Sequence, residues 1–148
     1  MMNYLQLFYL PIVLLLFSTS MYAQNSTAIE KKKYTSGKWD DEIGYTGAIQ
    51  SGNTIYISGI PGKGPMDEAI KKIYAQAEKI LASYGATFQN VVKETVYTTN
   101  IEELIKHQAQ KKAFYKGEYP ASTWVEIKRL YVPDAVIEIE FIVVVNNH

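Results

Sequence analysis

The chain has 148 residues, about the size of one domain, and its fifteen Lys and Arg residues balance its fifteen Asp and Glu residues. A net charge of zero argues against a nucleic-acid-binding protein, which needs a basic surface to neutralise phosphates. The lack of cysteine excludes disulfides, thiolate nucleophiles and Cys-based metal sites.

The N-terminal segment has the layout of a secretory signal peptide. Residues 1–23 contain no charged side chain and include an apolar run from Leu5 to Phe17, which is shorter than the ~20 apolar residues of a membrane-spanning helix. Small and polar residues then lead to Ala23, the expected last residue of the signal peptide. We therefore expect an exported protein, periplasmic or secreted, that starts at Gln24 and keeps no stable membrane association. An uncleaved anchor is the alternative, because no Lys or Arg precedes the apolar run.

The folded domain is expected to cover residues 41–148, after a flexible leader over residues 24–40. It begins with two strands, 44–50 and 53–58, which a Gly-containing turn joins into a hairpin. The Gly- and Pro-rich residues 59–65 predict an irregular loop that could line a binding site.

Two amphipathic helices and three more strands are predicted downstream. The apolar residues of the first helix recur at three- and four-residue steps, and Gly85 follows it as a C-terminal stop. Asn100, with Glu103 three residues later, predicts the N-cap of the second helix. The elements are a helix over 67–84, a strand over 91–99, a helix over 100–115 and strands over 122–130 and 136–145.

The order ββαβαββ predicts a two-layer α+β domain, in which both helices cover one face of a mixed sheet. The last strand is unusual, because residues 141–145 are apolar on both faces. A two-layer domain leaves one of these faces open to solvent, so we expect burial against another copy of the chain.

The C-terminal quarter of the chain contains the most specific motif. It consists of Pro120, Ala121, Thr123, Val125, Leu130 and the triplet Ile137-Glu138-Ile139. This pattern resembles the C-terminal signature of the RidA (YjgF) family of small trimeric imine and enamine deaminases. Residues 44–59 and 91–99 are also similar to the N-terminal hairpin and third strand of that family. The resemblance implies a chorismate-mutase-like fold, a homotrimer with small-molecule sites between subunits, and no cofactor.

The resemblance also implies which residues form the site. In the deaminases an Arg grips the carboxylate of a 2-imino acid, and a Glu near the last strand positions the water. Ser122 stands at the position of that Arg, and Glu138 at the position of that Glu. The other positions that match pocket residues of the family are Tyr45, Ser58, Gln108 and Trp124. No metal site is expected, because His107 and His148 have no metal-ligand spacing.

Serine at position 122 weakens the expected anchoring of an anionic substrate. A guanidinium forms two charge-assisted hydrogen bonds with a carboxylate, each worth roughly 1.5–3 kcal/mol, whereas a hydroxyl forms one neutral bond worth about 0.5–1.5 kcal/mol. Lys128 and Arg129 lie about 20 Å along the strand and cannot substitute. The ligand is therefore expected to be neutral or cationic and to stack on Trp124.

Three functions remain open at this point. The first is an imine or enamine hydrolase with altered substrate preference, in which Glu138 activates water. The second is a non-catalytic trimer that binds a small ligand. The third alternative is a structural protein with vestigial clefts. Retention of Glu138, Tyr45 and Ser58 disfavours this third alternative.

Overall fold

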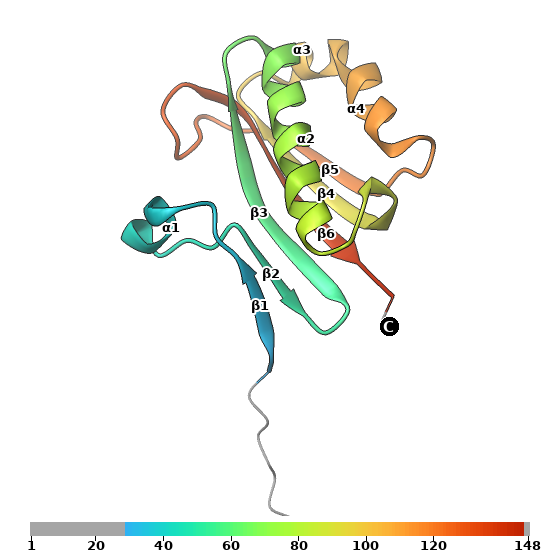
Figure 1. Cartoon of the computed structure of the whole chain (residues 1–148). Helices are drawn as coiled ribbons and strands as arrows, with labels where there is room; N and C mark the ends of the chain where they lie inside the picture. The colour runs from blue at the N-terminus through green and yellow to red at the C-terminus, as the bar shows by residue number, and fades with distance from the viewer. Residues whose placement is uncertain (1–28, 147–148) are drawn as a thin grey trace, which may run out of the picture.

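The computed structural model describes residues 29–146 as a six-stranded mixed sheet with helices packed against it (Figure 1). The strands are β1 Lys31–Tyr34, β2 Ala48–Ser51, β3 Thr54–Lys63, β4 Val91–Thr98, β5 Ala121–Glu126 and β6 Ala135–Val144. The helices are α1 Lys38–Ile43, α2 Met66–Ser83, α3 Ile101–Lys106 and α4 Gln108–Tyr115, with a short 3₁₀ helix, η1 Phe88–Asn90, before β4. The strand order is β1-β2-β3-β6-β4-β5, and only β4 and β5 run parallel within this sheet.

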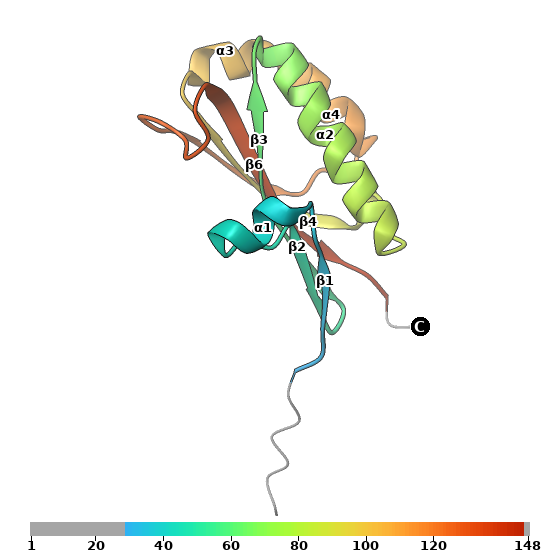
Figure 2. The same cartoon turned by 60° about the vertical axis from the view of Figure 1, so that its left-hand side comes forward.

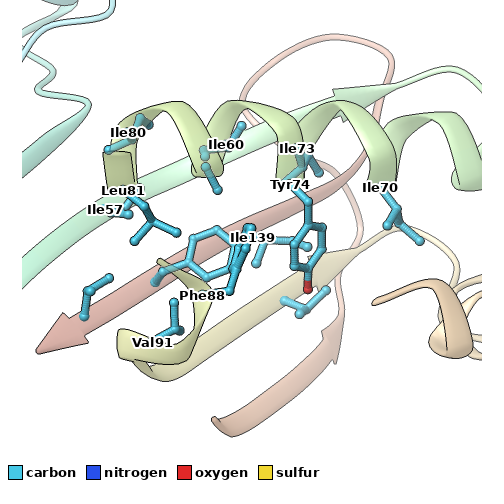
Figure 3. Close-up of a cluster of buried hydrophobic side chains, with 14 of the residues drawn as sticks. Ile57, Ile60, Ile70, Ile73, Tyr74, Ile80, Leu81, Phe88, Val91 and Ile139 are labelled. Atoms are coloured by element: carbon cyan, nitrogen blue, oxygen red, sulfur yellow. The ribbon is translucent and has the colours of Figure 1, made fainter. Parts of the chain in front are cut away.

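The predicted two-layer α+β fold with a mixed sheet is confirmed. Helices α2 and α4 cover one face of the sheet, as the two views in Figures 1 and 2 show. Helix α2 places one apolar stripe against the strands, and in Figure 3 its residues Ile73 and Tyr74 point toward Ile139 of β6. The helix lies close to the sheet, because a β-carbon added at Gly62 would come within 2.9 Å of Ala69 Cβ and Ile73 Cδ1. This face contains the hydrophobic core.

Strand β3 is longer than predicted, because it continues through the Gly- and Pro-rich residues that were expected to form a loop. Pro61 pairs with Glu138 of β6, and bulges interrupt the register between Ile57 and Ile60 and between Gly62 and Lys63. Strand β2 pairs with β3 only as far as Ile57. Pro61 is therefore tolerated, since that stretch of β3 has a strand partner on one side only.

Residues 31–43, most of which were expected to belong to a flexible leader, form β1 and α1 instead. Strand β1 pairs antiparallel with β2 and forms an edge of the sheet. Its sequence, Lys-Lys-Lys-Tyr, has no apolar alternation, so periodicity gave no indication of a strand; lysines are common on edge strands, where they discourage pairing with other chains. The predicted signal peptide lies outside the described residues. Within residues 29–146, no helix has the length and apolar character needed to cross a membrane.

The second predicted helix is divided at His107 into α3 and α4. His107 has φ −102° and ψ 10°, and its N–H donates to Leu104 O rather than continuing the α-helical pattern. The predicted N-cap is present, because the Asn100 side chain accepts a hydrogen bond from the Glu103 N–H at 3.0 Å. The break gives α4 its own direction, along which Gln108 and Lys111 reach the edge of the sheet next to β5.

The face of the sheet opposite the helices exposes apolar side chains to solvent. Tyr56 of β3 pairs with Ile142 of β6, and both alternate with the buried residues Ile57 and Phe141. Tyr56 is 52% exposed and Val144 is 37% exposed. The prediction that the last strand is apolar on both faces is therefore confirmed within the described chain, where only the helix-covered face is buried.

Candidate functional site

The six predicted site residues lie in two groups on opposite faces of the sheet. On β5, Ser122 and Trp124 stand beside Glu94 and Val96 of β4, which face the helices and are buried. On β6, Glu138 stands beside Tyr97 of β4, which belongs to the other face. No movement of side chains within one copy of the chain can bring Ser122 and Glu138 into one pocket.

Of the group Tyr45, Ser58 and Glu138, only Tyr45 and Glu138 line a cavity of about 490 Å³, here called the Glu138 cavity. Tyr45 lines it, and its hydroxyl donates to Gly59 O at 2.9 Å. Ser58 lies next to this pair, and its hydroxyl donates to Thr46 O at 2.7 Å. Helix α1 and the segment between β5 and β6 supply much of the rest of the wall, through Trp39, Ile43, Tyr131 and Val132.

Glu138 is the titratable group most suited to chemistry in this cavity. Its side chain lies against Gly59, where a β-carbon would overlap the carboxylate oxygen Oε1. No donor among residues 29–146 bonds to the carboxylate, and half-burial raises its pKa above the ordinary range for glutamate, with the charge of Glu140 adding to the increase. A carboxylate with a raised pKa and no internal partner can exchange protons with water or a ligand.

The second group lies around a cavity of about 290 Å³, here called the Ser122 cavity. Gln108 of α4 and Trp124 of β5 line it together with Ser122. The Ser122 hydroxyl donates to Glu94 Oε1 at 2.9 Å and accepts from Trp124 Nε1 at 2.7 Å. Its only proton is therefore used inside the protein, so Ser122 has none left to donate to a ligand.

Glu94 is the centre of a buried polar cluster behind this cavity. Its Oε1 accepts from Lys111 Nζ at 2.8 Å as well as from Ser122, and its Oε2 accepts from the hydroxyls of Tyr74 at 2.9 Å and Tyr115 at 2.6 Å. Burial alone would raise the pKa of Glu94, but the Lys111 ammonium and these hydrogen bonds hold it below its usual range. All four acceptor positions of the carboxylate are satisfied, which fits a structural role.

Lys111 is a cation near Ser122 that the sequence analysis missed. Lys128 and Arg129 were expected on the same strand as Ser122, but both lie beyond β5, which ends at Glu126. Lys111 comes from α4, is 2% exposed, and places its ammonium 4.0 Å from the centre of the Trp124 ring. The ligand predicted to stack on Trp124 would therefore meet a ring with Lys111 already on one face. Glu94 was the signal in the sequence. It shares one face of its strand with Val96 and Thr98, so its carboxylate points toward the core, where it needs a buried cation.

Within residues 29–146, no cluster of three or more His, Asp or Glu side chains could hold an ion. His107 Nε2 lies 3.2 Å from Glu103 Oε1 on the same helical segment, away from both cavities. Of the residues that line the two cavities, Glu138 is the group best placed for acid-base chemistry, because it is half-buried and its pKa is raised.

Comparison with known proteins identifies the family of this chain. Residues 35–145 match the family model described as Endoribonuclease L-PSP. A RutC family protein from Pyrococcus abyssi is 33% identical over 107 residues, which cover 66% of this chain and 84% of the relative. A protein from Rattus norvegicus, named 2-iminobutanoate/2-iminopropanoate deaminase, is 30% identical over 128 residues, with coverage of 80% and 93%. The solved structure of a YjgF/YER057c/UK114 family member from Mycobacterium tuberculosis superposes with a TM-score of 0.73 at 24% identity, covering 78% of this chain and all of that one.

Proposed function

Because the chain belongs to the RidA (YjgF) family, we propose that it hydrolyses the C=N bond of a small imine or iminium compound, with Glu138 as the group that activates water. The observation that carries this proposal is the state of the Glu138 carboxylate. It is half-buried in a cavity large enough for a small molecule, and its pKa is raised toward neutral pH. A general base works best when its pKa lies near the working pH.

The proposed reaction needs one water molecule and proton transfers through Glu138. The reacting species is the iminium form, so a neutral imine first takes one proton from solvent. Glu138 removes a proton from water while the water oxygen bonds to the C=N carbon, and the π electrons of that bond move to nitrogen, which gives a neutral carbinolamine. The protonated Glu138 then returns its proton to the nitrogen of this carbinolamine. The C–N bond breaks, ammonia or an amine leaves with the electron pair, and the hydroxyl proton passes to Glu138 and then to solvent. The products are a carbonyl compound and the released amine.

We propose further that a second copy of the chain completes the site, within a homotrimer. Two observations support this: Ser122 and Glu138 lie on opposite faces of one sheet, and the face around Tyr56 and Val144 is apolar and open. Association of copies through the open face would cover this apolar surface. Gln108, Ser122 and Trp124 of one copy would then face Tyr45, Ser58 and Glu138 of the next.

The substrate is expected to lack a carboxylate beside the imine. Ser122 spends its proton on Glu94, and Lys111 is paired with the same carboxylate, so neither offers an uncompensated charge to an anion. We expect at most trace activity on 2-iminobutanoate or 2-iminopropanoate. The second candidate function, a trimer that binds a small molecule without turnover, is favoured by the same engagement of Ser122.

The proposed location is outside the cytoplasm. It rests on the apolar run between Leu5 and Phe17 and the small residues that follow it. Mass spectrometry of the protein expressed with its full N-terminus is expected to find Gln24 as the first residue, and light scattering to give the mass of a trimer. An intact N-terminus, or a monomer at micromolar concentration, would contradict the corresponding part of the proposal.

The hydrolysis itself is tested with two imines generated in situ by amine and amino-acid oxidases. One is an aromatic aldimine without a carboxylate, and the other is 2-iminobutanoate. Glu138→Gln should lower kcat/KM for the aldimine by roughly 10²–10⁴-fold. Glu42→Gln, the same substitution on the exposed side of α1, should leave the rate unchanged. If both imines decay at the buffer rate while the protein still binds amines, the non-catalytic alternative is correct.

A further inference from the structure

We propose that the Glu138 cavity recognises a cationic nitrogen, of an amine or an iminium, between its carboxylate and an aromatic wall formed by Trp39, Tyr45 and Tyr131. This inference rests on the proposed function, because it names the substrate class of the same site. Its key residue, Trp39, belongs to α1 and lies in the part of that helix, up to residue 40, that sequence reasoning had assigned to a leader outside the domain.

The charge of the cavity is the first observation. Glu138 is its one charged lining residue, and no Lys, Arg or His within residues 29–146 lines it. An anion placed there would face a carboxylate without compensation in a partly desolvated space, which is costly. A cation would gain an ion pair with Glu138, which has no such partner within residues 29–146.

The aromatic wall is the second observation, and it is independent of the charge. Trp39 and Tyr45 form an edge-to-face pair with ring centres 5.5 Å apart at 60°. Tyr131, from the segment between β5 and β6, lines the same cavity and is 71% exposed, while Trp39 is 46% exposed. Large aromatic surface that remains open beside a carboxylate suits an organic cation, which the negative face of an aromatic ring attracts.

Asp40 fixes the position of this wall and adds to its negative potential. The Asp40 carboxylate is 1% exposed; its Oδ2 accepts from the Ser36 N–H at 2.6 Å, and Tyr45 N–H donates to Asp40 O at 2.7 Å. These bonds hold Trp39 and Tyr45 on either side of a short, well-anchored turn of helix. Asp40 Oδ1 has no hydrogen-bond partner in the described part of the chain, so the Ser36 N–H is the one donor to this carboxylate there.

The Ser122 cavity provides the contrast that makes the inference specific. It contains aromatic residues too, but its lining includes Lys111 and Lys112, and Lys111 already lies over the Trp124 ring. The charge of Lys111 is compensated by Glu94, and the Lys112 ammonium is the group that would repel a cationic ligand. Where the two groups of residues meet between copies, the cation is therefore assigned to the Glu138 side of the site, away from Lys112.

The test uses three probes that share a phenyl ring and differ in charge: benzylamine, benzyl alcohol and benzoate. Isothermal titration of the wild-type protein should show benzylamine binding at least tenfold more tightly than benzyl alcohol, with no measurable binding of benzoate. Equal affinity for the three probes, or preference for benzoate, would overturn the inference. This comparison needs no variant, so it does not depend on a mutant folding correctly.

Variants then locate the binding site. Trp39→Leu and Glu138→Gln should each weaken benzylamine binding by about tenfold, whereas Trp39→Phe, which keeps an aromatic face, should weaken it by less than Trp39→Leu. Glu42→Gln is the matched control on α1 and should bind as the wild type does. Benzylamine binding that is unchanged in both Trp39→Leu and Glu138→Gln would place the cation elsewhere and sink the proposal.

Failure of this inference and failure of the proposed function give different results. If benzylamine binds as expected and no imine is hydrolysed, the cation site stands and the hydrolase proposal fails. If an aldimine is hydrolysed in a Glu138-dependent way while benzylamine neither binds nor inhibits, the hydrolase stands and the cation site is wrong.

Discussion

The two cavities place carboxylates of the same chemical type in opposite situations. Glu94, behind the Ser122 cavity, is buried with four donors around it, and its pKa is lowered by the adjacent Lys111 ammonium. Glu138 is half-buried with no donor from the described chain, and its pKa is raised by that burial. A satisfied carboxylate stabilises the fold, whereas an unsatisfied one is available to a ligand or a proton.

This comparison changes the meaning of serine at position 122. By family resemblance alone, Ser122 is a lost substrate anchor. In the structure it is also a member of the Glu94 cluster, bonded to Glu94 on one side and to the Trp124 indole on the other. Position 122 therefore serves internal structure here, and recognition is expected to depend on the Glu138 cavity.

The largest effect should come from breaking the buried ion pair. Glu94→Leu leaves the Lys111 ammonium without a partner in a site that is 2% exposed, and should lower the free energy of unfolding by about 3–5 kcal/mol. Chemical denaturation measures this loss. The double variant Glu94→Leu/Lys111→Met removes both charges and should recover most of the stability. A cost below about 1 kcal/mol for Glu94→Leu would show that the pair is not the centre of this cluster.

The next effect concerns an arginine at position 122. Ser122→Arg alone should change kcat/KM for 2-iminobutanoate by less than about twofold, because the guanidinium would bond to Glu94, whose Oε1 lies 2.9 Å from Ser122 Oγ. The triple variant Glu94→Thr/Lys111→Met/Ser122→Arg has no Glu94 carboxylate to bind the guanidinium, which is then free to bind the substrate. Its kcat/KM for 2-iminobutanoate should rise about tenfold or more, since one charge-assisted bond is worth roughly 1.5–3 kcal/mol.

The control for this series is Glu94→Thr/Lys111→Met with Ser122 retained, which should show no gain in activity. If Ser122→Arg by itself restores activity as fully as the triple variant, Glu94 does not compete for the side chain at position 122. The Ser122 cavity would then be a dormant substrate pocket, and the contrast between the two cavities would lose its basis.

Sequence reasoning could predict the fold and name candidate residues such as Glu138, but it could not predict which of them lie together, for identifiable physical reasons. Helix α2 and the hairpin of β2 and β3 have strong apolar periodicity and turn chemistry, so they were predictable. The lysine-rich β1 has no such pattern, and its pairing with β2 depends on an edge that only the assembled sheet offers. Ser122 and Glu138 lie on opposite faces of the sheet because of how β5 and β6 each pair with β4. Short-range sequence patterns do not determine these two registers.

A smaller effect is expected in acid, where the Glu94 pair titrates. The folded-state pKa of Glu94 is lowered, so the stability that it contributes is present above its unfolded pKa of about 4.3 and is lost as pH falls through the folded value. Wild type should therefore lose stability below about pH 4 more steeply than the uncharged Glu94→Leu/Lys111→Met variant. Denaturation curves from pH 7 to pH 2 measure the difference. Parallel curves for the two proteins would contradict an ionised Glu94 in the fold.

The smallest effect concerns Glu138, the other carboxylate of the comparison, and the free energy that it costs to keep this side chain ionised in the folded protein. Its folded-state pKa is raised, so the folded protein holds a proton on Glu138 more tightly than the unfolded chain does, and stability falls as pH rises through that interval. Glu138→Gln removes this cost and should raise Tm at pH 7 by about 2 °C, although it lowers the rate of hydrolysis. The gain should disappear at pH 4, where Glu138 carries a proton in the folded state. Thermal unfolding of wild type, Glu138→Gln and the exposed control Glu42→Gln at both pH values separates this from a general charge effect, because Glu42→Gln should change Tm at neither. A Glu138→Gln variant that is less stable than wild type at pH 7 would show that the carboxylate has a stabilising partner, and that the Glu138 cavity resembles the Ser122 cavity more closely than the two geometries indicate.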